Sequence, residues 1–441
     1  MTKHPWLIHF TALWLAFVTF IYPIPHTIAL RNLMLLIGCI TLLIRLKPKP
    51  HFPSVPTARA ALVILGLLSL WMVVGTLCFG LDAQLSMSLF RGDWVVVLIV
   101  MSLGLLAGAT IQESNDPAAA ASTLVAAIVV TGLIHVVWLL GYQLWIALHG
   151  HIPWGHTPFA EKDFHSVIVN FLFALLLAEA VLRKVWQRHF LPFGNRYLFS
   201  AIIITSLAVA TLLARNTVIV TAVLVTAACI AYAVRTQLLR KPRSAWSGLA
   251  LVATLTLGLV TWSVGNDNRW STFLAAATLG TQIDTHRYWL EGDPQLLPHT
   301  ENGAPVDESA YLRAAWATAA LREIARHPLG VGYGHKAFGI AINDHYGLHT
   351  THESSHSGLL DFTLANGVPG LALWLALAGV LMVLGWRAFR TGNPVGLMLF
   401  LFVLGYLVRC ALDGHLSGWR LESYALTTGL LTALTLRLQK T

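Results

Sequence analysis

Long apolar stretches separated by short polar turns make up most of this chain. An apolar run of roughly 17–23 residues lets a helix cross a hydrocarbon core of about 30 Å. The pattern predicts about twelve spans, at residues 6–24, 28–46, 58–80, 93–111, 118–140, 165–183, 197–213, 216–235, 246–264, 368–386, 394–411 and 416–436. The predicted fold class is therefore an all-α polytopic membrane protein.

One long polar region interrupts this pattern between the ninth and tenth predicted spans. We predict nine spans within residues 1–264, a mainly helical loop over residues 265–367, and three spans with a tail over residues 368–441. Within the loop, Ser309–Arg326 and Gly358–Ala365 have helical patterns. The loop is the part of the chain with the size of a soluble domain, so we expect the chemistry there.

The basic residues predict the orientation, because Lys and Arg gather in alternate loops, as in the cytoplasmic loops of multi-pass proteins. These loops contain Arg45, Lys47, Lys49 and Arg59; Arg183, Lys184, Arg188 and Arg196; Arg235, Arg240, Lys241 and Arg243; and Arg387 and Arg390. Both termini are therefore predicted to be cytoplasmic and the 265–367 loop to face outward. The formal charge of +9 is dispersed over these loops, which argues against a nucleic-acid-binding face.

The densest group of reactive side chains is the segment from His345 to His356. If this segment were helical, His345, His349, His352 and His356 would fall on one stripe roughly 60° wide. The sequence His352-Glu-Ser-Ser-His356 also matches the H-E-x-x-H pattern of zinc proteases. His356 thus has three interpretations: a surface histidine, a zinc ligand, or a metal-free general base.

The zinc interpretation is the less favoured of the two chemical ones. A zinc site needs a third ligand and a helix that buries the histidine pair. The residues ahead of His352 are Leu-His-Thr-Thr, which give no apolar face. All four cysteines, Cys39, Cys78, Cys229 and Cys410, lie in predicted spans, so we expect neither a cysteine metal cluster nor a disulfide framework.

Several basic side chains are candidates for binding an anionic substrate. Arg215 follows a short span and is predicted to lie at headgroup depth, where it either extends to water or binds a phosphate bidentately. Arg313 lies near the start of the predicted loop helix, and Arg287 is a weaker candidate. Lys162 and His165 begin the sixth span and fit either a substrate headgroup or a solvated loop edge.

The glycine-rich turn Gly330-Val-Gly-Tyr-Gly-His335-Lys336 invites comparison with a phosphate-binding loop. The Walker pattern and its β-α-β context are absent from the sequence, so tight-turn geometry is the favoured interpretation. His335 and Lys336 remain candidate substrate-binding residues at the end of this turn.

Three separated motifs resemble the O-antigen ligase/polymerase superfamily. His356, Leu360, Gly367 and Gly370 match its histidine–leucine–glycine–glycine signature at the start of a transmembrane helix. The family's Arg-x-x-x-Trp/Tyr and Pro-Leu-x-Gly-Val-Gly elements are similar to Tyr-Leu-Arg313-Ala-Ala-Trp316 followed by His-Pro-Leu-Gly-Val-Gly-Tyr-Gly334. Its Ser/Ala-Arg turn is similar to Leu213-Ala-Arg215-Asn. Ser357 and Ala365-Asn366 depart from the usual pattern.

The resemblance implies an inverting, metal-independent glycosyltransferase with a GT-C-like arrangement of helices and no cofactor. Such enzymes transfer a glycan from undecaprenyl diphosphate at the periplasmic face of a Gram-negative inner membrane. By this resemblance His356, Arg215 and Arg313 are catalytic, and Arg215, Arg313, Arg287, Lys336, His335, His352 and Lys162 contact the donor diphosphate or substrate.

Lipid A–core is the acceptor that we favour, which makes the expected activity that of an O-antigen ligase. The size of the 265–367 loop and the lack of a soluble domain after the last span favour this choice over a protein acceptor. O-antigen polymerase and protein O-oligosaccharyltransferase activity are alternatives within the family. A membrane zinc metalloprotease and a lipid-linked sugar transporter are alternatives from other classes.

Overall fold

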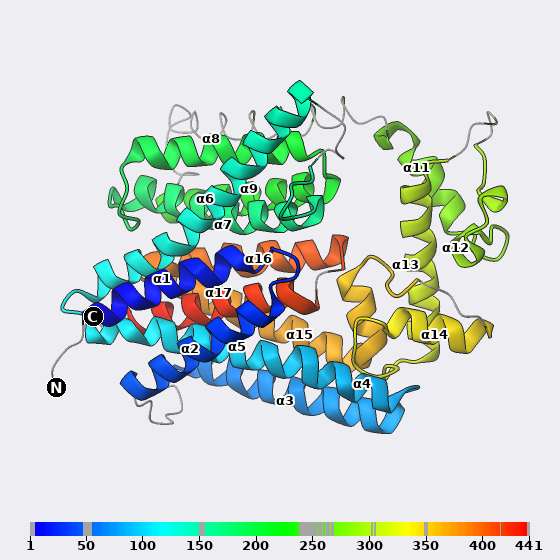
Figure 1. The fold of residues 1–441 in the computed structure, drawn as a ribbon, viewed down its shortest axis with the longest axis horizontal. Helices are drawn as coiled ribbons and strands as arrows, with labels where there is room; N and C mark the ends of the chain where they lie inside the picture. The colour runs from blue at the N-terminus through cyan, green and yellow to red at the C-terminus, as the bar shows by residue number, and fades with distance from the viewer. Residues whose placement is uncertain are drawn as a thin grey trace.

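The computed structural model of the 441-residue chain is a bundle of long helices with a smaller helical lobe at one end (Figure 1). It describes residues 5–46, 55–149, 155–237, 269–300, 306–347, 352–414 and 416–438, with a few isolated positions between them. The two termini lie at the end of the bundle opposite the lobe (Figure 1). No strand occurs within these described ranges.

Nine of the described helices are long and apolar enough to cross a membrane. They are α2 (Ile28–Leu46), α3 (Pro56–Phe79), the continuous segment Ala83–Glu113, α6 (Pro117–His149), α7 (Lys162–Trp186), α8 (Asn195–Leu212), α9 (Arg215–Thr236), α15 (Gly358–Arg390) and α16 (Pro394–Leu412). The segment Ala83–Glu113 comprises α4 (Ala83–Leu89), a π-helical turn (Phe90–Trp94), α5 (Val95–Ala109) and a 3-10 turn (Thr110–Glu113). These helices confirm the all-α polytopic membrane fold.

The remaining predicted spans have different outcomes. Helices α1 (Trp6–Ile21) and α17 (Gly418–Arg437) form where the first and last spans are expected, although neither is among the nine. The ninth predicted span, 246–264, falls almost entirely outside the described residues. The predicted total of twelve therefore remains a prediction.

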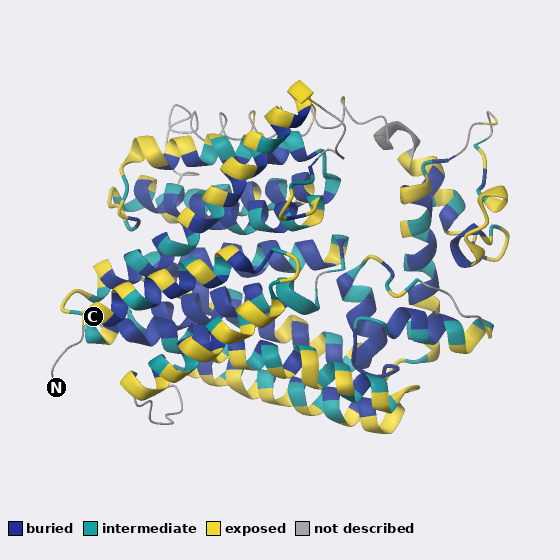
Figure 2. Cartoon of the chain, viewed as in Figure 1, coloured by how far each residue is buried: buried dark blue, intermediate teal, exposed yellow. Residues whose placement is uncertain are grey.

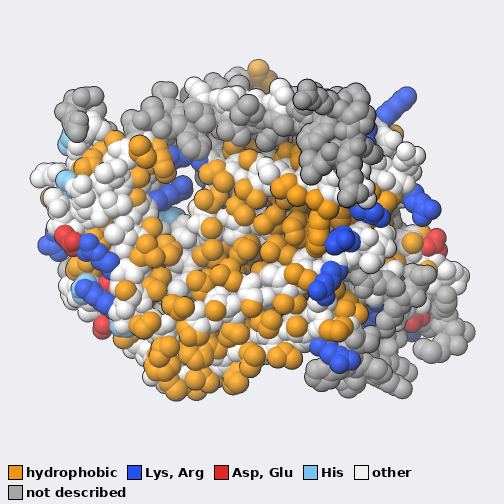
Figure 3. Space-filling model, turned by 180° about the vertical axis from the view of Figure 1, so that it is seen from behind, with side chains coloured by type: hydrophobic (Ala, Val, Ile, Leu, Met, Phe, Trp, Pro, Cys, Tyr) orange, Lys and Arg blue, Asp and Glu red, His pale blue; other side chains and the backbone are white. Residues whose placement is uncertain are grey.

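The bundle has an apolar exterior, as a lipid-facing surface requires. Leu13, Leu77 and Leu148 are among its many exposed large side chains. Figure 3 shows apolar side chains covering the middle of one face, with Lys and Arg toward its edges. Helices α7 and α16 lie in the interior, with 78% and 67% of their apolar windows buried, compared with 17% for α2 (Figure 2).

Small residues allow the central helices to pack closely. A Cβ added at Gly108 of α5 would lie 2.6 Å from the Cβ of Ala433 on α17, and one added at Gly385 of α15 would lie 2.7 Å from the carbonyl oxygen of Gly396 on α16. Close backbone approach of this kind is how membrane helices associate without a hydrophobic driving force between them.

The lobe has a small aromatic core of its own. It comprises α11 (Arg269–Gly280), α12 (Tyr288–Glu291), a 3-10 turn (Pro294–Leu296), α13 (Glu308–Arg326) and α14 (Ala337–Tyr346). Trp289 donates to the carbonyl of Ile283, and Trp316 donates to the carbonyl of Trp289. Helix α13 begins where the sequence predicts, because the Asp307 side chain accepts from the Ala310 N–H at 2.7 Å.

The glycine-rich turn docks on a break in α15. Gly367 is non-helical, with φ 69° and ψ 178°, and so it divides the predicted short helix from the predicted tenth span. The N–H groups of Val331 and Gly332 donate to the carbonyls of Leu364 and Ala365. A Cβ at Gly367 would lie 2.6 Å from the carbonyl oxygen of Pro328, so close backbone packing as well as its positive φ requires glycine there.

Candidate active site

His356 lies on a short non-helical segment, residues 352–357, that leads from the lobe into α15. Its backbone is left-handed, with φ 59°, and its N–H donates to the Ser354 Oγ at 3.3 Å. Its imidazole stacks on Trp316 of α13, with ring centroids 5.0 Å apart and an interplanar angle of 19°. His352 contacts the same indole at 5.1 Å.

The histidine stripe is not helical in the described residues. His345 lies in α14, whereas His352 and His356 lie on the non-helical segment 352–357, and His349 is outside the described ranges. The two histidines of the H-E-x-x-H sequence are therefore not one turn apart on a helix, as a zinc protease requires. No cluster of three or more potential ligands for a metal ion forms among the residues that the structure describes.

The surroundings of His356 favour its neutral form. Partial burial lowers the pKa of this imidazole below its usual value, and the Arg313 guanidinium lowers it further. The carboxylates of Asp413 and Asp163 act in the opposite direction but do not reverse the shift. Partial burial lowers the pKa of His352 as well. A neutral imidazole near pH 7 is able to accept a proton.

Arg313 reaches the site because of its position on α13. It lies three residues before Trp316, so the two side chains lie on neighbouring positions of the same helical face. Trp316 is held in place by burial and its hydrogen bond to Trp289, whereas Arg313 is exposed. The Arg313 guanidinium is close enough to His356 to lower the pKa of its imidazole.

Asp413, at the end of α16, links the histidine segment to the turn between α8 and α9. Its carbonyl accepts from the Gly358 N–H at 3.0 Å. Its Oδ2 accepts from the Asn216 Nδ2 at 2.8 Å and from the Arg409 Nη2 at 3.2 Å. Ser357 adds a hydrogen bond to the carbonyl of Ala411 at 3.1 Å.

Arg215 is the first residue of α9 and lies next to Asn216 in this turn. Leu213 takes a left-handed conformation, with φ 49°, which reverses the chain between the two helices. The guanidinium of Arg215 lies 5.4 Å from the ring centroid of Phe273 on α11, so it reaches toward the lobe. The Lys162 Nζ donates to the Leu213 carbonyl at 3.2 Å, which places Lys162 at the same turn.

A buried polar network around Arg409 connects Asp413 to the first turns of α7 and α9. Arg409, with only 1% of its surface exposed, donates to the Ser166 Oγ at 2.5 Å and to the Asn170 Oδ1 and Thr217 Oγ1 at 3.2 Å. Its remaining contact is with Asp413. A buried charge with several partners holds the N-terminal parts of α7 and α9 and the C-terminal part of α16 in fixed positions.

The other candidate residues divide into two groups. Lys336 pairs with Glu353 at 2.7 Å and His335 with Asp93 at 3.3 Å, so both lie beside the histidine segment or the pocket next to it. Arg287 pairs with Glu291 on the exposed surface of the lobe, and no described contact joins it to His356. His165 bonds to Thr157 at 3.0 Å within its own loop.

Sequence reasoning missed Asp413 and Asp163. Each is an acidic residue at an end of a predicted span, on the side assigned to the 265–367 loop. That placement was the available signal, because a carboxylate at the edge of a membrane helix is costly without a partner. Only the fold shows that both lie near His356.

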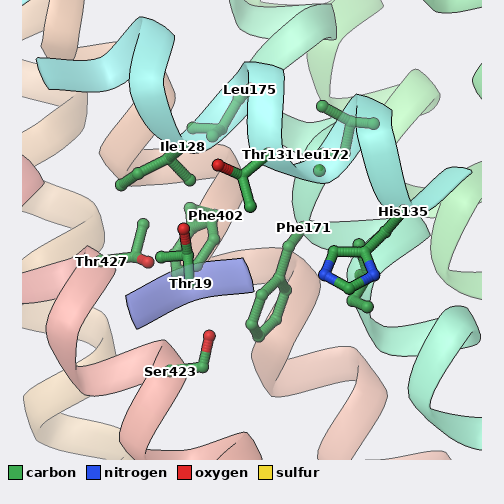
Figure 4. Close-up of a pocket in the computed structure, with 12 residues that line it drawn as sticks. Thr19, Ile128, Thr131, His135, Phe171, Leu172, Leu175, Phe402, Ser423 and Thr427 are labelled. Carbon is green, nitrogen blue, oxygen red and sulfur yellow. The ribbon is translucent and has the colours of Figure 1, made fainter. Parts of the chain in front are cut away.

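A second pocket lies within the bundle, among α1, α6, α7, α16 and α17 (Figure 4). Its polar lining includes His135, Thr131 and Thr19, which point toward it in Figure 4. Their polar atoms bond to backbone carbonyls: His135 to Phe20 at 2.9 Å, Thr131 to Ala127 at 2.9 Å and Thr19 to Leu15 at 2.7 Å. These bonds give Thr19, Thr131 and the Nε2 of His135 partners within the protein, and we assign the pocket no chemistry.

Comparison with known families identifies one part of the chain. Residues 200–375 match the family model described as O-antigen ligase. The matched region runs from α8 into α15 and includes Arg215, Arg313 and His356, whereas Asp163 and Asp413 lie outside it. No curated protein matches the chain.

Proposed function

From the membership of residues 200–375 in the O-antigen ligase superfamily, we propose that this multi-pass membrane protein is a lipopolysaccharide O-antigen ligase. It transfers a glycan from undecaprenyl diphosphate to a hydroxyl of lipid A–core. In this proposal residues 265–367 form the catalytic loop, between the membrane helices of residues 1–264 and those of residues 368–441.

The observation that carries the proposal is the setting of His356. Its imidazole stacks on Trp316, beside one guanidinium and two carboxylates, and the net effect of these surroundings favours the neutral form. The arginine turn at Arg215 is tied to the same segment through Asn216 and Asp413. In this proposal the base of this region is His356, and its two cationic groups are Arg215 and Arg313.

This arrangement suits displacement at an anomeric carbon. His356 takes the proton of the acceptor hydroxyl as its oxygen forms a bond to that carbon. The bond from the carbon to the diphosphate oxygen breaks, and undecaprenyl diphosphate leaves with the electron pair. Arg215 and Arg313 stabilise the charge that develops on the leaving group. Attack from the face opposite the diphosphate inverts the configuration.

The carboxylates complete the proposed mechanism. Asp413 and Asp163 both stabilise the protonated imidazole, which forms during the reaction. Asp413 also orients the Asn216 side chain, and so it fixes the turn from which Arg215 extends. Since a diphosphate is already a good leaving group, the arginines suffice for charge stabilisation and no metal is needed.

The proposed orientation places this region at the periplasmic face of the inner membrane. The chain order of the spans puts Asp163, Arg215, His356 and Asp413 at the same end of the bundle as the lobe (Figure 1). Arg183 and Arg387 lie in the last turns of α7 and α15, which are at the opposite end of these helices. The positive-inside rule then assigns both termini to the cytoplasm.

Reconstitution with defined substrates tests the proposal. Purified protein, given undecaprenyl-diphosphate-linked O-antigen, should glycosylate lipid A–core, and this transfer is measured by a mobility shift and mass of the product. Elongation of a second donor molecule would identify a polymerase instead, and modification of a serine peptide would identify a protein glycosyltransferase. Absence of transfer to all three acceptors would contradict the glycosyltransferase proposal.

The pH dependence of transfer should follow the charge state of His356. Because the base is inactive when protonated and its pKa is lowered, kcat/KM should be constant near pH 7 and fall only below about pH 6.5, the usual imidazole value. Arg313→Gln removes a charge that lowers this pKa, so the acidic limb should move to higher pH. Asp413→Asn removes a charge that raises it, so the limb should move to lower pH.

Arg313→Lys is the matched control for this profile, because it retains the charge and should leave the limb close to that of the wild type. The decisive comparison is the direction of the two shifts. Identical limbs in Arg313→Gln and Asp413→Asn would remove His356 as the group that titrates.

A further inference from the structure

The cavity beside the His356 segment is separate from the bundle pocket of Figure 4. Its lining residues are Tyr333, Gly334, His335, Ser354, Gly358, Asp361, Phe362, Ala365, Asn366, Gly414, Leu416 and Ser417. They come from the glycine-rich turn, the first part of α15 and the connection between α16 and α17. Ser354 and Gly358 lie two residues on either side of His356, so the segment that carries the proposed base forms part of the cavity wall.

Two buried oxygen acceptors line this cavity. Asp361 is 8% exposed and its Oδ1 accepts from the Ser355 N–H at 2.8 Å. Asn366 is 2% exposed and its Nδ2 donates to the Phe362 carbonyl at 3.1 Å. The Asn366 Oδ1 is buried without a hydrogen-bond partner among the described residues. A buried acceptor without a partner is costly, and Asn366 is one of the cavity's lining residues, so a ligand that donates a hydrogen bond here would remove that cost.

The rest of the wall combines aromatic surface with further polar groups. Tyr333 and Phe362 supply largely buried aromatic rings. His335 lies in the wall and pairs with Asp93 at 3.3 Å. An apolar wall with a few convergent polar groups is the usual composition of a small-molecule site. Carboxylate and amide acceptors beside aromatic rings match a sugar, which offers hydroxyl donors and an apolar ring face.

We propose that this cavity, with Asp361 and Asn366 as its hydrogen-bond acceptors, is the subsite for a sugar of the acceptor glycan. The inference rests on the proposed function, and it specifies where the nucleophilic substrate binds. In this proposal the sugar donates hydroxyl hydrogen bonds to Asp361 and Asn366. A neighbouring hydroxyl of the same sugar is then the one that His356 deprotonates.

The position of the cavity distinguishes acceptor from donor. The proposed diphosphate ligands are on α9 and α13, whereas the cavity is built from α15 and lies beside Asp93, in the turn between α4 and α5. In Figure 1, α9 and α4 lie on opposite sides of α15 and α16. In-line displacement requires the attacking hydroxyl to approach from the side opposite the diphosphate, which a donor held at Arg215 and an acceptor held in the cavity would provide.

Gly414 provides a way to fill the cavity. Its backbone is outside the left-handed region, and a Cβ there would lie 3.9 Å from both the Asp361 Oδ2 and the Ser354 Oγ. Gly414→Leu should therefore occupy the cavity without backbone strain and raise KM for lipid A–core by at least about tenfold. Gly414→Ala should raise it less. Asp361→Asn keeps an acceptor for the Ser355 N–H but removes the charge, and should raise the acceptor KM by about tenfold.

Gly379→Leu is the matched control, because nothing lies within 4 Å of a Cβ added at Gly379 elsewhere on α15. Its kinetics should equal those of the wild type. In all variants the donor KM should stay within about twofold of the wild type, since the proposed diphosphate ligands are untouched. Retained thermal stability in detergent separates a filled cavity from misfolding.

Binding of lipid-free core oligosaccharide, measured by calorimetry, separates this inference from the proposed function. Transfer by the wild type with an unchanged acceptor KM in Gly414→Leu would overturn the subsite and leave the function standing. A rise in donor KM instead would assign the cavity to the donor sugar and also overturn the inference. Gly414-dependent oligosaccharide binding without transfer would support the subsite and refute the function. Neither binding nor transfer would refute both.

Discussion

Replacing either Arg215 or Arg313 by Ala should reduce glycan transfer by on the order of 10²–10³-fold, the usual effect of removing one group that stabilises charge in the transition state. Arg313 on α13 acts electrostatically on the His356 imidazole, and Arg215 begins α9 beside Asn216, which bonds to Asp413. The effect should appear mainly in kcat, because the charge on the diphosphate oxygen grows as the bond to the sugar breaks.

Lysine at position 215 should restore only part of this activity. An ammonium keeps the charge but loses the planar fork that grips two phosphate oxygens, and it interacts differently with the Phe273 ring. Arg322→Ala is the matched control: Arg322 is also on α13 but pairs with Asp284 at 2.6 Å on the exposed surface. Full transfer by folded Arg215→Ala or Arg313→Ala would remove that arginine from the mechanism.

The membrane helices were predictable because hydrophobicity alone determines them. The predicted spans 28–46 and 394–411 agree closely with α2 (Ile28–Leu46) and α16 (Pro394–Leu412). Where the prediction was too short, as for α7 (Lys162–Trp186), the helix continues into polar turns at its ends. Hydropathy detects only the part of a helix that meets hydrocarbon, so it does not fix these ends.

The candidate site was only partly predictable. Local motifs identified His356, Arg215 and Arg313. In the fold, His356 stacks on Trp316, and the Arg313 guanidinium lowers the pKa of its imidazole. The contacts of Asp413 could not be predicted in this way. Its bond to Asn216, for example, joins residues 197 positions apart in the chain. Periodicity carries no information on such contacts, and it also suggested a helical histidine stripe, although the chain is not helical at His352 and His356.

The two histidines and the glutamate of the H-E-x-x-H sequence should differ sharply in their importance. His356→Ala should lower transfer by about 10²–10⁴-fold, the usual effect of losing a general base. In the proposed mechanism His356 alone takes the proton; His352 packs on Trp316 and Glu353 forms an exposed ion pair with Lys336. His352→Ala and Glu353→Ala should therefore retain measurable transfer, with little change in stability from the loss of the exposed pair.

The most direct measurement is transfer by the purified protein and these three variants, with and without EDTA, together with the zinc content of the protein. Our account predicts that only His356→Ala loses transfer to the background rate and that EDTA leaves the wild type unchanged. A zinc unit would instead fail when any one of its two histidines or its carboxylate is removed. Stoichiometric zinc that is lost together with activity on chelation, and equal inactivation of all three variants, would contradict the metal-free assignment of His356.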